Sequence, residues 1–317
     1  MAARHALGRW STTAGTVLCL AALLLFCGPP SEAREFKVLD AYRAYADGPT
    51  VNDPADYIAW LKTQPRFRDG KLDRLPDRAV ILHHVDVRGM LNKLGYPDAQ
   101  IEELRIGHID PNRLFVVRPT SGRPFIVNRG LPGAGGISTQ AAELGALGVR
   151  QAIHIGTAGL LGERLPYASL IVGQGSYKDG ASFLLASSAR EAAEQIAFAD
   201  PDLTEAIDRQ MTSAHVAHRR ALGFTSPVYY FQKVGLLRSL LAFPFDAEKA
   251  PGFVEMEEAP FFVTARLAGM KAASVVVGSD RAVPAGDTVR QEFYDGDLDA
   301  LLALALRQAI ATLSAQH

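Results

Sequence analysis

The chain has 317 residues, 48% of them hydrophobic and 21% charged, and a formal net charge of −1. This balance is typical of a globular protein with a large core, and it gives no indication of nucleic-acid binding. Both cysteines, Cys19 and Cys27, lie in the N-terminal segment 1–33, so the remainder of the chain folds without disulfides.

Residues 1–33 have the pattern of a secretory signal peptide. Two arginines precede an apolar segment at 14–27, which is followed by prolines and by a small-residue pattern that ends at Ala33. A transmembrane anchor is the alternative, but the apolar run is short for a span. Lipid modification of Cys27 is disfavoured because the bulky Phe26 precedes it. We therefore expect cleavage after Ala33 and a secreted or periplasmic mature protein that does not remain in a membrane.

Changes in composition along the chain divide it into three segments. Residues 1–33 form the signal peptide, residues 34–78 are a polar and aromatic N-terminal extension, and residues 79–317 form one domain. The extension contains a predicted short helix at 56–61, capped by Asp53. In the domain, apolar β-branched runs alternate with helical segments, which predicts a single α/β domain with a mixed, mostly parallel β-sheet sandwiched by α-helices.

The domain begins with a predicted buried strand at 79–82. The later predicted elements are, in chain order, a helix from about Arg88, a hairpin of 114–117 and 124–127, a helix capped by Ser138 or Thr139, a strand at 151–155, a strand at 170–173, a helix from about Asp202 to Arg219, a strand near 221–225, a helix at 257–267, a strand at 272–277, and a helix at 298–313.

The glycine-rich stretch 127–159 predicts a strand, a glycine loop, a helix and a second strand. A helix that starts behind a glycine loop can hold an anion with its free N–H groups. A dinucleotide cofactor is disfavoured because no acidic residue follows the next strand at the required spacing, and a P-loop is excluded because the loop lacks Lys. We expect no cofactor.

Several other residues are candidates with two open interpretations each. Arg88, at a helix start, could add charge to an anion site or be solvated. Aromatic residues at 229–231 could stack on a planar ligand or pack in the core. Asp280 follows a buried strand, where a carboxyl group could act as an acid or cap the next turn. No metal is expected, because the adjacent His83 and His84 point to opposite faces of a strand.

Four blocks in the same order carry a resemblance to a known family. They are the glycine segment before 137–139, the block 155–159, the block 179–182, and the segment 255–257 followed by Ser279-Asp280. Together they resemble the nucleoside phosphorylases, which include purine nucleoside phosphorylases, uridine phosphorylases and nucleosidases. The similarity extends from about Ala79 to Leu313. It implies cleavage of a nucleoside, in first place a purine nucleoside, by inorganic phosphate to free base and ribose 1-phosphate, in a homo-oligomer.

The resemblance also implies roles for individual residues. Glu257 matches the glutamate that accepts hydrogen bonds from the ribose hydroxyls, and Met256 the methionine that packs on the sugar. Asp280 matches the aspartate that protonates the base at N7. Thr157 matches a phosphate-contacting hydroxyl. The remaining residues of these motifs are expected beside them: Gly135 and Gly136 at the phosphate, Glu255 and Ser279 at the ribose and base.

The chain also departs from the family pattern at the expected phosphate site. Arg88 of the first phosphate loop is kept, but the preceding glycine is lost, and His154 replaces the second arginine. A protonated His154 could still donate to phosphate. Two alternatives therefore stay open: a nucleosidase that uses water, and a secreted nucleoside-binding protein without turnover. A serine hydrolase is disfavoured because the chain has no G-x-S-x-G elbow.

Overall fold

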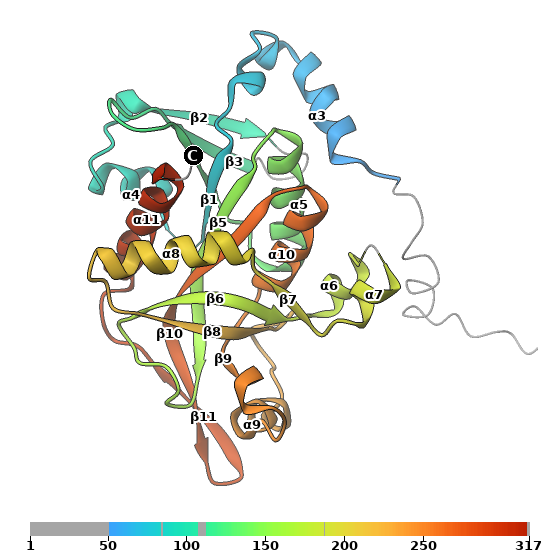
Figure 1. Ribbon diagram of the computed structural model, residues 1–317, viewed down its shortest axis with the longest axis vertical. Coiled ribbons are helices and arrows are strands. Elements are labelled where there is room, and N and C mark those ends of the chain that lie inside the picture. Colours follow the sequence, from blue (N-terminus) through green and yellow to red (C-terminus); the bar gives the residue numbers. More distant parts are fainter. Residues whose placement is uncertain (1–50, 84, 107–111, 187, 316–317) are drawn as a thin grey trace, which may run out of the picture. The chain divides into compact units, whose positions relative to one another are not determined.

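The computed structural model describes residues 51–83, 85–106, 112–186 and 188–315. The signal-peptide prediction for 1–33 lies outside these residues. The described strands form one 11-stranded sheet, covered by helices on both faces (Figure 1). The strands are β1 Arg78–Leu82, β2 Ile101–Ile106, β3 Asn112–Val117, β4 Phe125–Arg129, β5 Gln151–Leu161, β6 Leu170–Tyr177, β7 Ile196–Phe198, β8 His218–Thr225, β9 Pro251–Glu255, β10 Lys271–Ala285 and β11 Thr288–Phe293.

The sheet is mixed, as predicted. Of the strand pairings described, five are parallel and six are antiparallel. The sequence predicts mostly parallel pairing, and this holds for the centre of the sheet but not for the sheet as a whole. Parallel pairing joins β4, β1, β5 and β10. Because β10 also pairs with β6, and β9 pairs with both β5 and β8, the strands β5, β9, β8, β6 and β10 close into a ring.

The helices are α3 Pro54–Thr63, α4 Val87–Lys93, α5 Gly133–Ala146, α6 Gly180–Leu184, α7 Ala189–Ala193, α8 Pro201–Ser213, α9 Val234–Ala242, α10 Glu258–Leu267 and α11 Leu298–Ala315. Strand side chains alternate between the faces of a sheet, and β1 shows the result. Ala79 and Ile81 pack in one core cluster with α5 and α10, whereas Val80 and Leu82 pack in another with α8 and α11.

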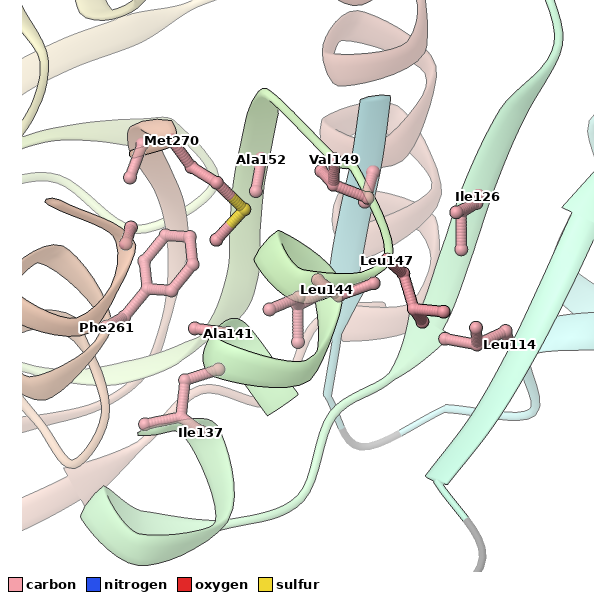
Figure 2. Packing of buried hydrophobic residues seen from close by; sticks show 14 of the residues in the cluster. Leu114, Ile126, Ile137, Ala141, Leu144, Leu147, Val149, Ala152, Phe261 and Met270 are labelled. Carbon is pink, nitrogen blue, oxygen red and sulfur yellow. The ribbon is translucent and has the colours of Figure 1, made fainter. Parts of the chain in front are cut away.

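The core on the α5 side is built by side chains one helical turn apart (Figure 2). Ile137, Ala141 and Leu144 of α5 are fully buried, and they face Phe261 and Met270 from the α10 region. Burying a large aliphatic side chain stabilises the fold by about 1.5–3 kcal/mol. This packing fixes the position of the α5 N-terminus, which reaches the functional site.

The described part of the N-terminal extension packs on the domain, as expected. Asp53 caps α3, because its carboxylate accepts a hydrogen bond of 2.8 Å from the Ala55 N–H. Ile58, Leu61 and Phe67 belong to the same buried cluster as the α5 side chains.

The start of α5 corrects one prediction. The helix begins at Gly133, behind Pro132, and not at Ser138 or Thr139. The glycines at 133–136, which the sequence predicts as a loop, form the first helical turn. Gly136 is needed there, because a Cβ at this position would lie 2.8 Å from the Leu131 Cβ.

Other boundaries also differ from the prediction. Helix α8 ends at Ser213, and the chain turns at His215, which has a left-handed φ of 54°. Residues 218–219 therefore belong to β8 and not to the helix. Strands β5 and β10 run on past their predicted ends to Leu161 and Ala285, because they continue to pair with each other or with β11.

Helix α11 is the one described helix that is long and apolar enough to cross a membrane by length and composition. Its buried side chains, among them Leu302, Leu306 and Leu313, pack against β1, β5 and β10 as part of the protein core.

Candidate active site

A cavity of about 800 Å³ lies where β5, β9 and β10 of the strand ring meet the β10–β11 hairpin. Thr157 of β5 and Ser279 and Asp280 of β10 line it, together with Met256 and Glu257 from the turn between β9 and α10. With Glu255, which also lines the cavity, the structure brings together six residues that the sequence predicted as one site. The cavity size lies within the usual range for sites that bind small molecules.

Glu257 is held at the cavity wall by the N-terminus of α5. Its Oε1 accepts a hydrogen bond of 2.6 Å from the Gly133 N–H. Burial, and then repulsion from the neighbouring Glu255 carboxyl group, raise the pKa of Glu257 to about 7. The Gly133 N–H opposes this rise, because it stabilises the ionised form. Glu257 therefore changes its charge near neutral pH.

Glu255 also borders the cavity, but both of its oxygens are engaged by the protein. Oε1 accepts hydrogen bonds from the Thr225 and Ser176 hydroxyls, at 2.5 and 3.0 Å. Oε2 accepts from the backbone N–H groups of Glu257 and Glu258. These bonds fix the turn between β9 and α10, and they orient Glu257.

Asp280 lies inside β10, at a bulge, and not at the C-terminal end of the strand as predicted. The pairing register with β5 shifts between Gly278 and Asp280. The carboxyl group accepts two side-chain hydrogen bonds, from the Ser279 hydroxyl at 2.8 Å and from Gln291 Nε2 at 2.6 Å. Asp280 is 7% exposed, and a Cβ at Gly159 would lie 2.9 Å from its Oδ2. The carboxyl group is therefore fixed in orientation and faces the cavity.

The aromatic residues at 229–231 line the cavity and are exposed, so they do not pack in the core. The Tyr229 and Tyr230 rings meet edge to face, with centroids 4.8 Å apart. Phe231 is 91% exposed and has a left-handed φ of 63°. Their placement leaves aromatic faces available to a planar ligand.

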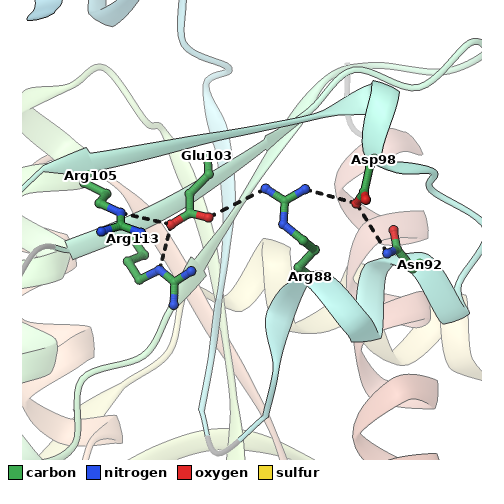
Figure 3. Close-up of polar contacts among 6 residues, drawn as sticks. All are labelled: Arg88, Asn92, Asp98, Glu103, Arg105 and Arg113. Carbon is green, nitrogen blue, oxygen red and sulfur yellow. Dashed lines mark hydrogen bonds and ion pairs between the residues drawn. The ribbon is translucent and has the colours of Figure 1, made fainter.

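The structure places Arg88 away from this cavity, in a network of ion pairs (Figure 3). Its guanidinium contacts Asp98 at 3.0 Å and Glu103 at 3.6 Å. Glu103 also accepts from Arg113 at 2.8 Å and from Arg105 at 3.3 Å. Arg88 thus has two carboxylate partners on the protein itself, at the edge of the sheet.

His154 and the two glycines predicted at the phosphate also lie outside the cavity lining. His154 is 1% exposed, and its ring packs against the His83 ring at 4.9 Å and the Phe261 ring at 5.9 Å. Gly135 and Gly136 lie in the first turn of α5; the Gly135 N–H has no acceptor within the helix, whereas Gly136 is the first position whose N–H has one, the carbonyl of the N-cap Pro132. Among the described residues that line the cavity, none is Lys, Arg or His.

A neighbouring cavity of about 570 Å³ shares Pro132 with the first one. Arg113 and Arg129 line it, together with His83 and Asp86. Neither arginine was singled out from the sequence. Arg129 carries a readable signal, because it ends a buried strand directly before the glycine stretch.

Gln291 was also missed. Its signal was Gly286-Asp287, a two-residue hairpin turn that sends the chain back beside β10. In the part of the chain that the structure describes, no group of three His, Cys, Asp or Glu residues is arranged to hold a metal ion.

The mixed sheet with its strand ring and its helices on both faces is the α/β fold that solved nucleoside phosphorylases also have. The family model of the phosphorylase superfamily matches residues 88–312. The chain belongs to this family.

Solved structures with the same fold include phosphorylases and nucleosidases. Uridine phosphorylase from Vibrio fischeri is 20% identical, with a TM-score of 0.60 over 77% of this chain and 94% of that chain. Purine nucleoside phosphorylase from Toxoplasma gondii is 16% identical, with a TM-score of 0.57 over 77% and 91%. The 5′-methylthioadenosine/S-adenosyl homocysteine nucleosidase from Campylobacter jejuni is 13% identical, with a TM-score of 0.58 over 76% and 100%. A comparison with curated proteins gave no significant match.

Proposed function

We propose that the protein cleaves the N-glycosidic bond of purine nucleosides and releases the free base. One observation carries the proposal: Glu257 and Asp280 line the same cavity, beside exposed aromatic side chains. Cleavage of this bond builds positive charge on the sugar and negative charge on the base. A carboxylate at the sugar and an acid at the base stabilise these two charges.

Each residue has a role in this reaction. Glu257 accepts hydrogen bonds from the ribose hydroxyls, and Met256 packs on the sugar. Asp280 gives its proton to the base as the bond breaks, and the bonding electron pair stays with the base. Tyr229 and Tyr230 stack on the purine ring.

Water is the attacking group that the cavity favours. A phosphate ion needs cationic or N–H donors, and the described lining residues include no Lys, Arg or His. Arg88 is paired with two carboxylates, and His154 is buried against other rings. The oxygen of water then bonds to C1′, and its released proton restores Asp280.

Phosphorolysis is the second candidate, and a specific feature favours it. The neighbouring cavity carries Arg113 and Arg129 and meets the first cavity at Pro132. Phosphate bound between the two cavities would attack the same carbon, with ribose 1-phosphate as the product.

The test is an incubation of the purified protein, from Arg34 onward, with adenosine, inosine and uridine, with and without phosphate. We expect release of purine at equal rates in both buffers. Release that requires phosphate would move the assignment to phosphorolysis. Saturable binding without any release would overturn the proposal in favour of a nucleoside-binding protein.

Two further proposals concern the whole protein. We propose that it is exported and processed after Ala33, and that it acts as a homo-oligomer. The N-terminal sequence of the exported protein tests the first proposal. Light scattering of the purified protein tests the second, and a single monomer mass would contradict it.

A further inference from the structure

The hydrogen bond between Asp280 and Gln291 limits what the site can recognise. Gln291 Nε2 donates to Asp280 Oδ2 at 2.6 Å, and both residues line the cavity. The side-chain amide has two unlike ends, one that donates and one that accepts. Because the nitrogen of the Gln291 amide donates to Asp280, the oxygen of this amide is the end that remains as an acceptor for a ligand.

The strand register keeps this arrangement in place. In the antiparallel pair of β10 and β11, Asp280 lies opposite Phe293, and Gln291 lies opposite Ala282. Gln291 is therefore a diagonal neighbour of Asp280 on the same face of the hairpin, a spacing that long side chains can bridge. The Oε1 of Gln291 has no hydrogen-bond partner within the described part of the chain.

A protonated Asp280 beside this amide oxygen presents one donor and one acceptor to a bound base. The matching edge of adenine has an acceptor at N7 and a donor at the 6-amino group. A 6-oxopurine presents two acceptors on the same edge. The 6-oxygen of such a base would face the Oε1 of Gln291, and two acceptors cannot form a hydrogen bond. Rotating the Gln291 amide to present its nitrogen to the base would break the hydrogen bond from Nε2 to Asp280.

We propose that Gln291 is a specificity-determining residue that selects 6-aminopurine nucleosides over 6-oxopurine nucleosides. This inference rests on the proposed function. Asp280 gives its proton to N7, the electron pair of the C1′–N9 bond passes to the base, and Gln291 Oε1 accepts from the 6-amino group throughout.

The experiment compares kcat/KM for adenosine and inosine in the wild type and in Gln291→Met, with and without phosphate. Methionine has a similar length and no strong polar atom. We expect the wild type to prefer adenosine by about 5- to 150-fold, the range of a good hydrogen-bond contact to a base edge. The variant should lose this preference, with both nucleosides cleaved at similar kcat/KM.

Gln232 provides the matched control, because it is the other glutamine of the cavity lining. Its Nε2 donates to the Val228 carbonyl at 3.0 Å and to the Ser226 hydroxyl at 3.3 Å, away from Asp280. Gln232→Met should keep the adenosine-to-inosine ratio of the wild type.

Equal use of adenosine and inosine by the wild type, with no change in Gln291→Met, would overturn the inference and leave the proposed function intact. If no nucleoside is cleaved, the proposed function fails. Calorimetric binding of free adenine and hypoxanthine then still tests the inference. A preference for adenine that Gln291→Met removes would support it, and equal binding of the two bases would overturn it.

Discussion

Glu257 and Gly133 lie 124 positions apart, and a hydrogen bond of 2.6 Å joins the Gly133 N–H to Glu257 Oε1. The positive end of the α5 dipole, which the glycine stretch suggested as a phosphate site, thus receives a carboxylate of the chain itself. This contact fixes one oxygen of Glu257 at the wall of the cavity.

The pKa of about 7 for Glu257 predicts a pH-dependent activity. An ionised carboxylate accepts hydrogen bonds from sugar hydroxyls more strongly than a protonated one. We expect kcat/KM to rise as the pH passes through 7. Glu257→Gln should lower kcat/KM at pH 8 by about 10- to 100-fold and remove this rise. Glu205→Gln, at a half-buried position of α8 outside the cavity lining, is the control, and an identical pH profile in all three proteins would contradict the assignment.

Asp280→Asn should keep the fold and lose the proton donor. Asparagine can still accept from Gln291 through its single oxygen, and its amide nitrogen can donate to the Ser279 hydroxyl, so the local hydrogen bonds are largely kept. Since general acid catalysis contributes about 10²–10⁴-fold, we expect kcat to fall by this factor with adenosine. A sugar whose leaving group needs no protonation, such as a nitrophenyl riboside, should be cleaved at nearly the wild-type rate. Equal losses with both substrates would show that Asp280 is not the acid.

Arg88→Gln should lower the stability of the protein slightly and leave its activity unchanged, because Arg88 forms ion pairs within the protein and does not contact the cavity. Its ion pairs to Asp98 and Glu103 are partly exposed, so their loss should cost at most about 1 kcal/mol of unfolding free energy. The response of base release to added phosphate should match that of the wild type. Arg129→Gln is the informative comparison, because this side chain lines the neighbouring cavity. A phosphate response lost in Arg88→Gln and kept in Arg129→Gln would restore Arg88 as the phosphate ligand.

Gly173→Ala should destabilise the protein. A Cβ at this position in β6 would lie 2.2 Å from the Ser274 Oγ and 2.5 Å from the Glu258 Oε1. Overpacking of this kind costs about 1–3 kcal/mol, which urea unfolding would measure. Gly235→Ala is the matched control, because nothing lies within 4 Å of the added Cβ, and in α9 it should be neutral or stabilising. Equal stability of the two variants would contradict the contact.

Glu258 should make the protein less stable as the pH rises. Burial, and then the neighbouring Glu255, raise the pKa of Glu258 well above its ordinary value. Its Oε1 accepts from the Ser274 hydroxyl at 2.5 Å, and the side chain is fully buried. The folded state favours the protonated acid, so this stabilisation is complete below the unfolded pKa and is lost as the pH rises towards the folded one.

Glu258→Gln has no proton to lose at this position. Its unfolding free energy relative to the wild type should therefore grow between pH 5 and 8, by at most about 1.4 kcal/mol per pH unit. Urea unfolding at both pH values measures this difference. Glu102→Gln, at a half-buried position on β2, should show no such trend. A constant difference between Glu258→Gln and the wild type would mean that Glu258 is ionised in the folded protein.

The sequence by itself determined most of the central helices and strands, because hydrophobic periodicity and capping act over a few residues, but it did not indicate β2, β9, β11 or α9. It also determined the family and the carboxyl groups Glu257 and Asp280, which lie in local motifs. The tertiary structure decided which residues meet in the cavity. The register of β10 and β11 brings Gln291 to Asp280, and the packing of α5 brings Gly133 to Glu257. It also turned Arg88 to Glu103 and Asp98. These contacts join segments distant in the chain, and their geometry depends on strand pairing and core packing, which no local pattern specifies.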